Sequence, residues 1–317
     1  MEIHGRRRGQ ASGRVWIGPS GYSYQEWRGG FYPAGLAANR WLAHAARQFD
    51  SIELNGTFYS LKSPDSFQAW ASAAPPAGFV YAVKGTRFVT HDKKLHDVET
   101  PLANFFASGV LALGDKTGPF LWQLPPGLGF HEDRVAAFLD LLPRSTEEAE
   151  ILAREHDDRL TRGALTEAVA HVRYRHAFEI RHRTFVSPAF YKLLAQRGDA
   201  LVIADTAGLY PVVEEPTADF VYVRLHGDTE LYRSRYEDEA LTSWANRIEQ
   251  WAKGGRDVYV YFDNTALGHA PYDALRLVAM LEERGIPRPS AGATKRVPEQ
   301  GQLCFQGGQG LRVKGTR

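Results

Sequence analysis

Short apolar runs rich in β-branched and aromatic residues recur along the chain and alternate with longer amphipathic stretches. We identify eight of these runs as strands, over residues 15–18, 51–55, 79–84, 120–124, 176–181, 200–205, 220–226 and 258–264. Helical periodicity fills most of the intervals, over residues 39–49, 64–73, 101–113, 132–142, 188–197, 237–253 and 272–284. Strands that alternate with helices predict a parallel sheet, because a parallel connection needs a crossover long enough to hold a helix.

The runs LVIAD, FVYVRLH and VYVYF are apolar almost throughout, which is typical of strands buried on both faces. Eight such units predict an α/β fold of the TIM type, a closed (β/α)8 barrel. No G-x-G-x-x-G follows the first strand, which disfavours a dinucleotide-binding sheet. The interval between Asp205 and Phe220 is short and rich in Pro and Thr, so we expect one outer helix to be short or missing after strand six.

The composition excludes several classes of protein. With 44% hydrophobic and 12% aromatic residues the chain can fold around a sizeable core. The 38 Lys+Arg against 37 Asp+Glu give a net charge of +1, which argues against a broad phosphate-binding surface. Cys304 is the only cysteine, so we expect neither an intrachain disulfide nor a cysteine-based metal site. No apolar run approaches the roughly 18 residues of a membrane helix, and we expect a cytoplasmic protein with no membrane partner.

The two ends of the chain differ from its middle. Residues 1–13 are basic and residues 288–317 are rich in Gly, Gln and Arg, and both stretches have little apolar periodicity. We interpret them as flexible tails that flank a single barrel domain over residues 14–287.

Polar residues gather where the predicted strands end, which is where the active sites of such barrels form. They are Glu53, Asn55, Lys84, Gln123, Glu179, Arg181, His182, Asp205, Arg224, His226 and Asn264. Side chains alternate along a strand, so Glu53 and Asn55 share a face, as do Glu179 with Arg181 and Arg224 with His226. Charges in a doubly buried strand are costly unless they are paired, so these groups need one another or a ligand. A self-contained ion-pair network without catalytic function is the alternative explanation.

The chemistry of these side chains suggests roles. Glu53 and Glu179 are acid–base candidates, His226 is a proton shuttle, and Lys84 is an electrostatic clamp or a Schiff-base amine. We assign these four as catalytic and the other strand-end residues as substrate-binding. Arg181 and Arg224 in particular carry planar forks that suit a carboxylate or a phosphate.

Two loops border the predicted barrel mouth. The stretch SGYSYQEWRGGFYP contains Tyr22 and Trp27, which we place as substrate-binding residues of a lid or stacking wall, or alternatively as satellite core. The stretch THDKKLH brings His91 near Lys84, and we add His91 to the substrate-binding set.

Seven stretches, in order, are similar to the motifs of one family. They are SGYSYQEWRGGFYP, FDSIELNGTFY, GFVYAVKGTRFVTHDKKL, LALGDKTGPFLWQLPP, FEIRHRTF, VYVRLHG and VYVYFDN. The chain thereby resembles the YecE-like family, a domain of unknown function, from about Val15 to about Arg284. The resemblance implies a TIM-type barrel and no established reaction. Its motif positions coincide with the strand-end set and His91. Pro19 and Asp263 depart from the family pattern, in which Asn is common at the second position, so Asp263 stays outside the candidate set.

Three functions are compatible with these residues. The first, which we favour, is metal-free acid–base catalysis on a small anionic substrate, with no cofactor and no obligate protein partner. The second is a phosphodiesterase or a nucleic-acid-processing enzyme that depends on a divalent metal, although interspersed Arg and Lys would repel a cation. The third is a non-catalytic module that binds a ligand.

Overall fold

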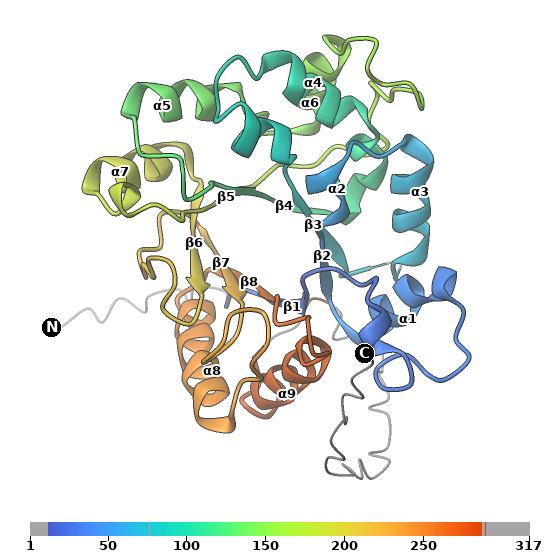
Figure 1. Cartoon of the computed structure of the whole chain (residues 1–317), viewed down its shortest axis with the longest axis vertical. Helices are drawn as coiled ribbons and strands as arrows, with labels where there is room; N and C mark the ends of the chain where they lie inside the picture. The colour runs from blue at the N-terminus through green and yellow to red at the C-terminus, as the bar shows by residue number, and fades with distance from the viewer. Residues whose placement is uncertain (1–11, 76, 287–288, 290–317) are drawn as a thin grey trace, which may run out of the picture.

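Eight parallel strands form a nearly closed ring in the computed structural model, which describes residues 12–75, 77–286 and 289 (Figure 1). They are β1 (Val15–Pro19), β2 (Ser51–Leu54), β3 (Val80–Lys84), β4 (Thr117–Gln123), β5 (His176–Glu179), β6 (Ala200–Asp205), β7 (Phe220–Leu225) and β8 (Asp257–Phe262). From β2 to β8 each strand pairs with the next strand of the chain, and β8 pairs with β1. The gap between β1 and β2 is closed by the Gly21 amide, which donates to the Glu53 carbonyl at 2.8 Å. The predicted TIM-type barrel is therefore confirmed.

Helices surround this ring (Figure 1). The α-helices are α1 (Trp41–Gln48), α2 (Gly56–Tyr59), α3 (Pro64–Ala73), α4 (Glu99–Ala107), α5 (Glu132–Leu141), α6 (Thr146–Arg154), α7 (Pro188–Arg197), α8 (Asp238–Lys253) and α9 (Ala270–Glu283). Shorter 3-10 turns are η1 (Gln25–Trp27), η2 (Ala38–Arg40), η4 (Val110–Lys116) and η5 (Arg183–Phe185), and η3 (Phe88–Asp92) is a π-helical turn. The described residues between β6 and β7 form no helix, as the sequence predicts.

Local chemistry explains where helix α7 begins and ends and how the barrel closes between β1 and β2. The Ser187 hydroxyl accepts a hydrogen bond from the Phe190 amide, Pro188 occupies the first turn of α7, and Gly198 ends the helix in the left-handed region. At the barrel seam a Cβ on Gly18 would lie 1.7 Å from the Ser51 carbonyl oxygen. Closure of β1 against β2 therefore requires glycine at position 18.

The strands divide their side chains between two apolar regions. Odd-numbered β8 residues such as Tyr259 and Tyr261 pack inside the barrel, together with Trp16 and Tyr222. Even-numbered residues such as Val258 and Val260 pack outward against the helices. This alternation decides which strand-end residues face the barrel interior.

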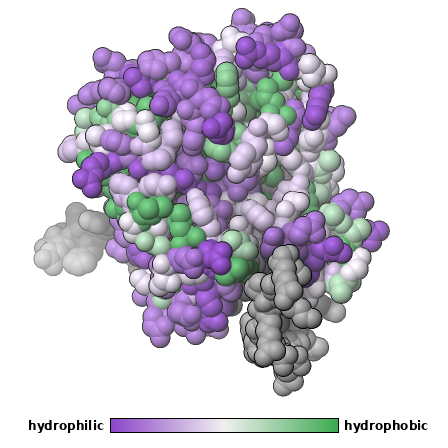
Figure 2. Space-filling model, viewed as in Figure 1, coloured by the Kyte–Doolittle hydropathy of each residue, from purple (hydrophilic) through white to green (hydrophobic). Residues whose placement is uncertain are grey.

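The predicted tails, residues 1–13 and 288–317, lie almost entirely outside the described residues. Figure 2 shows one face of the molecule as mostly hydrophilic, with small and scattered apolar areas. Within the described ranges, no helix combines the length and the apolar character that a bilayer crossing needs.

Candidate functional site

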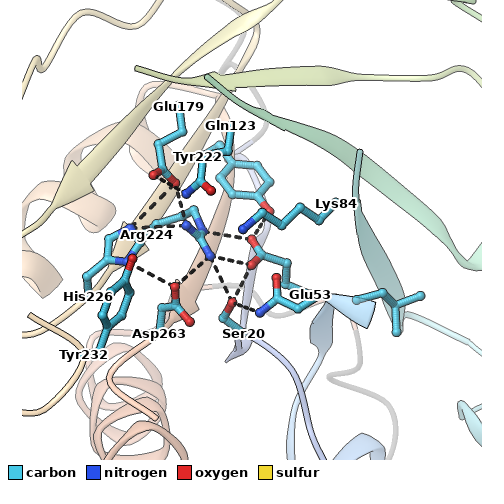
Figure 3. Close-up of polar contacts among 12 residues, drawn as sticks. Ser20, Glu53, Lys84, Gln123, Glu179, Tyr222, Arg224, His226, Tyr232 and Asp263 are labelled. Atoms are coloured by element: carbon cyan, nitrogen blue, oxygen red, sulfur yellow. Dashed lines mark hydrogen bonds and ion pairs between the residues drawn. The ribbon is translucent and has the colours of Figure 1, made fainter. Parts of the chain in front are cut away.

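The inward-facing positions at the carboxyl ends of the strands form a ring of polar side chains. The ring contains Ser20 after β1, Glu53 on β2, Lys84 on β3, Gln123 on β4, Glu179 on β5, Arg224 on β7 and Asp263 after β8. At the corresponding level β6 contributes Ala204, which packs inside the barrel. Segments far apart in the chain thus bring their polar groups to one end of the barrel (Figure 3).

Arg224 lies at the centre of this ring and is fully buried. Its guanidinium donates through Nε and Nη2 to the two carboxylate oxygens of Glu53, at 3.1 and 2.8 Å. Nη1 donates to Glu179 Oε2 at 2.5 Å, and Nη2 also donates to Asp263 Oδ2 at 2.9 Å. Nη2 lies 3.1 Å from Ser20 Oγ as well. One guanidinium therefore joins three carboxylates from three strands (Figure 3).

The carboxylates of Glu53 and Glu179 accept further hydrogen bonds. Tyr222 donates to Glu53 Oε2 at 2.6 Å, and the Ser20 hydroxyl donates to Glu53 Oε1. Gln123 Nε2 and Arg181 Nε donate to Glu179 Oε1 at 2.7 and 3.1 Å. Glu53 and Glu179 are thus buried side chains with hydrogen bonds at both carboxyl oxygens.

The charge network lowers the pKa values of Glu179 and Asp263. Burial raises the pKa of Glu179, but Arg224, His226 and Arg181 outweigh it and hold the pKa well below the usual range. Burial likewise opposes ionisation of Asp263, and Arg224 and His226 overcome it and lower the pKa to about 2. Both groups are carboxylates at neutral pH.

His226 follows β7 and is fully buried beside these acids. Its Nδ1 lies 3.1 Å from Asp263 Oδ2, and its Nε2 lies 3.6 Å from Glu179 Oε2. Burial and Arg224 lower its pKa, but Glu179 and Asp263 prevail, so the pKa is raised above that of a free histidine. The two acids thus favour the protonated form of His226, whose positive charge in turn stabilises the carboxylates of Glu179 and Asp263.

Lys84 differs from the other charged members of the ring. It is 8% exposed, and no hydrogen bond or ion pair joins its ammonium to any other described residue. Its Nζ lies 4.4 Å from the centre of the Phe58 ring. Burial and the neighbouring Arg224 lower its pKa to about 8, although Glu53, Glu179 and Asp263 oppose this shift.

Arg181, His91 and Asn55 lie above the ring, at its solvent side. Arg181 is held by Glu179 and by the Tyr232 hydroxyl at 3.1 Å, and its side chain is 13% exposed. Burial and the cations Lys84 and Arg181 lower the pKa of His91 to about 4, so its imidazole is neutral at pH 7. Asn55 donates to Ser20 Oγ at 2.7 Å, while its buried Oδ1 has no hydrogen-bond partner among the described residues.

The structure does not bring three of the predicted strand-end residues into this cluster. Asp205 has the outward parity of Ile203, and its carboxylate accepts from the Tyr236 hydroxyl at 3.1 Å. Asn264 also faces outward and donates to Asp273 at 2.8 Å. His182 caps η5 by accepting from the Thr184 amide at 3.3 Å. These three side chains therefore form hydrogen bonds with residues of the outer helical layer and the loops, outside the Arg224 network.

The two aromatic candidates of the first loop take different positions. Trp27 is 1% exposed and packs against Tyr24 and Phe31, so it belongs to the satellite core that we considered as its alternative. Tyr22 is half-buried, and its hydroxyl accepts from Trp70 Nε1 at 3.0 Å. Neither side chain has a contact with the Arg224 network.

Sequence reasoning missed four participants, of which Asp263 is the most important. The alternation Tyr259, Tyr261, Asp263 gives Asp263 inward parity, and this signal was available in the sequence. We left Asp263 out of the candidate set because Asn is common at this position in the family that the chain resembles. Tyr222 shares the inward parity of Arg224, so the same signal applies to it. Ser20 and Tyr232 carry no distinguishing sequence pattern, and Tyr232 stands out in the structure by its positive φ of 64° and its contact with Arg181.

The donor set of the cluster does not suit a metal ion. Both oxygens of Glu53 and of Glu179 already accept from guanidinium, amide or hydroxyl groups. Across the described residues, no three His, Cys, Asp or Glu side chains are arranged so that they could hold a metal. A cation would also have to displace Arg224 and approach Lys84.

Two surface hollows lie away from the cluster. One of about 460 Å³ is lined by residues of the loop before α4 and of α5, among them Leu95, Arg134 and Phe138. The other, of about 310 Å³, lies beside it and is lined in part by Phe88 and Arg159.

Comparisons with known proteins agree with this architecture. The model of a family described as "Protein of unknown function DUF72" matches residues 16–297. The UPF0759 protein YunF of Bacillus subtilis is 20% identical over an alignment of length 297, which covers 84% of this chain and 95% of that protein. The crystal structure of a DUF72 family protein from Thermotoga maritima has a TM-score of 0.67 at 25% identity and covers 85% of this chain and 99% of that one. A DUF72 family protein from Enterococcus faecalis has a TM-score of 0.64 at 16% identity, over 84% and 95% of the two chains.

Proposed function

Because the chain belongs to the DUF72 family, whose function is unknown, its activity has to come from its own site, and we propose that this site performs acid–base chemistry on a small anionic substrate. The observation that carries the proposal is the unpaired ammonium of Lys84 above a network whose other charges are paired. A buried unpaired charge costs free energy, and a bound anion would supply the missing partner.

The substrate-binding surface in this proposal is the solvent side of the ring. Arg181 retains an Nη1 that has no partner among the described residues, and it lies beside the same network as Lys84. Asn55 offers an unsatisfied carbonyl oxygen. Two cationic groups suit a carboxylate or phosphate, and the amide oxygen can accept a hydrogen bond from a hydroxyl group of the same substrate.

Lys84 is the group that we assign to proton exchange. A pKa of about 8 places its ammonium and amine forms within reach of each other near neutral pH, as a general acid–base catalyst requires. His91 remains a neutral imidazole beside it and can accept or relay a proton. Gln123 contacts Glu179 and lines the same ring.

Glu53, Glu179 and His226, which we predicted to be catalytic, take a different role in this proposal. They are buried and lie against Arg224 or one another. We therefore assign them as positioning residues, which hold the Arg224 guanidinium in place and contribute to the electrostatic field at Lys84. The occupied carboxylates also make the metal-dependent alternative less compatible with the site, and we do not pursue it. A cytoplasmic location remains part of the proposal.

Proton exchange in heavy water tests the proposed chemistry. The protein is incubated with small carboxylates and phosphate esters in D2O, and loss of C–H signals or new products is followed by proton NMR. We expect at least one compound to exchange or react with the wild type and with Lys192→Met, which removes an exposed lysine on α7. Lys84→Met should be inactive. Equal exchange by Lys84→Met and wild type would remove Lys84 from the chemistry, and anion binding without exchange would favour a non-catalytic module.

A further inference from the structure

We propose that Lys84 forms an imine with the carbonyl carbon of a small oxo acid whose carboxylate binds Arg181. This inference rests on the proposed function and narrows its substrate class to anions that carry an aldehyde or a ketone. The observation behind it is geometric: the Lys84 amine lacks a polar partner and lies beside the Phe58 ring, and both Lys84 and Arg181 lie close enough to His91 to act on its charge.

The surroundings of Lys84 favour a nucleophilic amine. The end of β3 is fixed because the Lys84 carbonyl accepts a hydrogen bond from Thr57 Oγ1 at 2.6 Å. The side chain then extends along Phe58, toward the centre of the ring (Figure 3). Burial and the positive charge of Arg224 destabilise the ammonium, so a substantial part of Lys84 is a neutral amine near pH 8.

Other lysines of the described residues lack this combination. Lys116 is also buried, but its Nζ is 3.7 Å from Asp115. Lys94, Lys192 and Lys253 are exposed, and Lys253 is bonded to Glu249. An ordinary lysine with a pKa near 10.4 has on the order of a hundredfold less neutral amine at pH 7 than one with a pKa near 8. Lys84 should therefore react selectively.

The step is a balanced condensation. The neutral Lys84 amine adds to the carbonyl carbon, so an N–C bond forms while the C–O π pair moves onto oxygen. The nitrogen loses a proton and that oxygen gains one, which gives a carbinolamine. The hydroxyl group then leaves with a second proton as water, and the nitrogen lone pair closes the C=N bond. The products are an imine and one water, with no oxidant or reductant.

Arg181 supplies the selectivity for an acid. Its Nε is bound to Glu179 and one Nη to the Tyr232 hydroxyl, so its plane is fixed and the other Nη is left for a ligand. Tyr232 is held in the left-handed region by its own backbone contacts, since its amide donates to the His226 carbonyl at 2.5 Å and its carbonyl accepts from Ala266 at 3.1 Å. The guanidinium is therefore oriented before the substrate arrives.

Reductive trapping tests the imine. The full chain is incubated at pH 7 with glyoxylate and sodium cyanoborohydride, and the carboxymethylated lysines are mapped by peptide mass spectrometry. We expect Lys84 to be modified at least about tenfold faster than Lys94 or Lys192. Propanal, which has no carboxylate, should label Lys84 more slowly than glyoxylate. Arg181→Met should remove that preference while the labelling of exposed lysines stays unchanged.

Because the modified lysines are mapped in the wild-type protein, the test does not depend on whether Lys84→Met folds. Uniform labelling of exposed lysines with Lys84 unmodified would overturn the imine. Thermal melts with oxalate, an anion without an aldehyde or ketone group, separate the two proposals. If oxalate raises Tm and no adduct forms, the anion site stands and the imine falls. If oxalate neither raises Tm nor slows glyoxylate labelling, both proposals fail.

Discussion

Arg224 and Glu53 come from strands that are not neighbours in the barrel, and they meet in a fully buried, two-pronged ion pair. Nη2 lies 2.8 Å from Oε1 and Nε lies 3.1 Å from Oε2. Because β7 and β2 are separated by β8 and β1, this contact ties opposite parts of the ring together. The pair therefore links two sides of the barrel. Its charges also contribute to the electrostatic field at Lys84.

Arg224→Met should strongly destabilise the fold. The substitution leaves Glu53, Glu179 and Asp263 without their common cation, and removal of one partner of a buried pair costs about 3–5 kcal/mol. The free energy of unfolding from urea titrations measures the loss. Arg181→Met is the matched control, because Arg181 is partly exposed and contacts only Glu179 among the acids. A loss for Arg224→Met no larger than that for Arg181→Met would contradict a supporting role of the network.

The fold was predictable because strand number, strand burial and helix periodicity all indicate the same architecture. The missing helix after β6 followed from the short Pro- and Thr-rich interval. The short elements α2 and η3 were not predictable, since each depends on contacts with the barrel end rather than on a local pattern. Thr57 in α2, for example, is fixed by carbonyls of two different strands.

The site was predictable only as far as strand parity was applied. Glu53, Lys84, Gln123, Glu179 and Arg224 face inward as expected, whereas Asp205 and Asn264 face outward. Parity counted from Tyr259 and Tyr261 would have selected Asp263 instead. The positions of Ser20 and Tyr232 could not be derived in this way, because they follow the strands and depend on loop conformation.

Asp205→Asn should leave the anion site intact. The amide oxygen still accepts from the Tyr236 hydroxyl, and the pKa of Asp205 is already raised by burial, so loss of its charge removes no favourable contact with the ring. We expect the free energy of unfolding to stay within about 1 kcal/mol of wild type and the oxalate-induced rise in Tm to be unchanged. A lost Tm response in a folded Asp205→Asn protein would show that β6 does contribute to the site.

Asp263→Asn should lower the pKa of Lys84 below about 8. Asp263 is one of the three acids that favour the ammonium, so its neutralisation leaves burial and Arg224 less opposed. The pH dependence of Lys84 labelling measures this pKa, and its midpoint should move to lower pH. An unchanged or higher midpoint would mean that Asp263 does not act on Lys84. Asp273→Asn changes a similarly buried carboxylate in the outer layer and should leave the midpoint in place.

We expect the free energy of unfolding to fall in acid because of the buried histidine His176. It is fully buried, its Nδ1 accepts from Trp122 at 3.1 Å, and its Nε2 contacts the Pro143 carbonyl at 2.8 Å. Burial and the nearby Arg144 lower its pKa to about 3, and the hydrogen bond to Pro143 only partly offsets this. Between about pH 6.5 and pH 3 the unfolded histidine binds a proton that the folded one does not, so stability falls as the pH falls.

His176→Gln retains an acceptor and a donor but does not titrate. From pH 7 to pH 5 the wild type should therefore lose about 2 kcal/mol more stability than the variant, as measured by urea unfolding at each pH. His96→Gln, at an exposed histidine, should follow the wild-type dependence. Parallel pH profiles for wild type and His176→Gln would show that His176 is protonated equally in the folded and unfolded chain, contrary to its burial between Trp122 and Pro143.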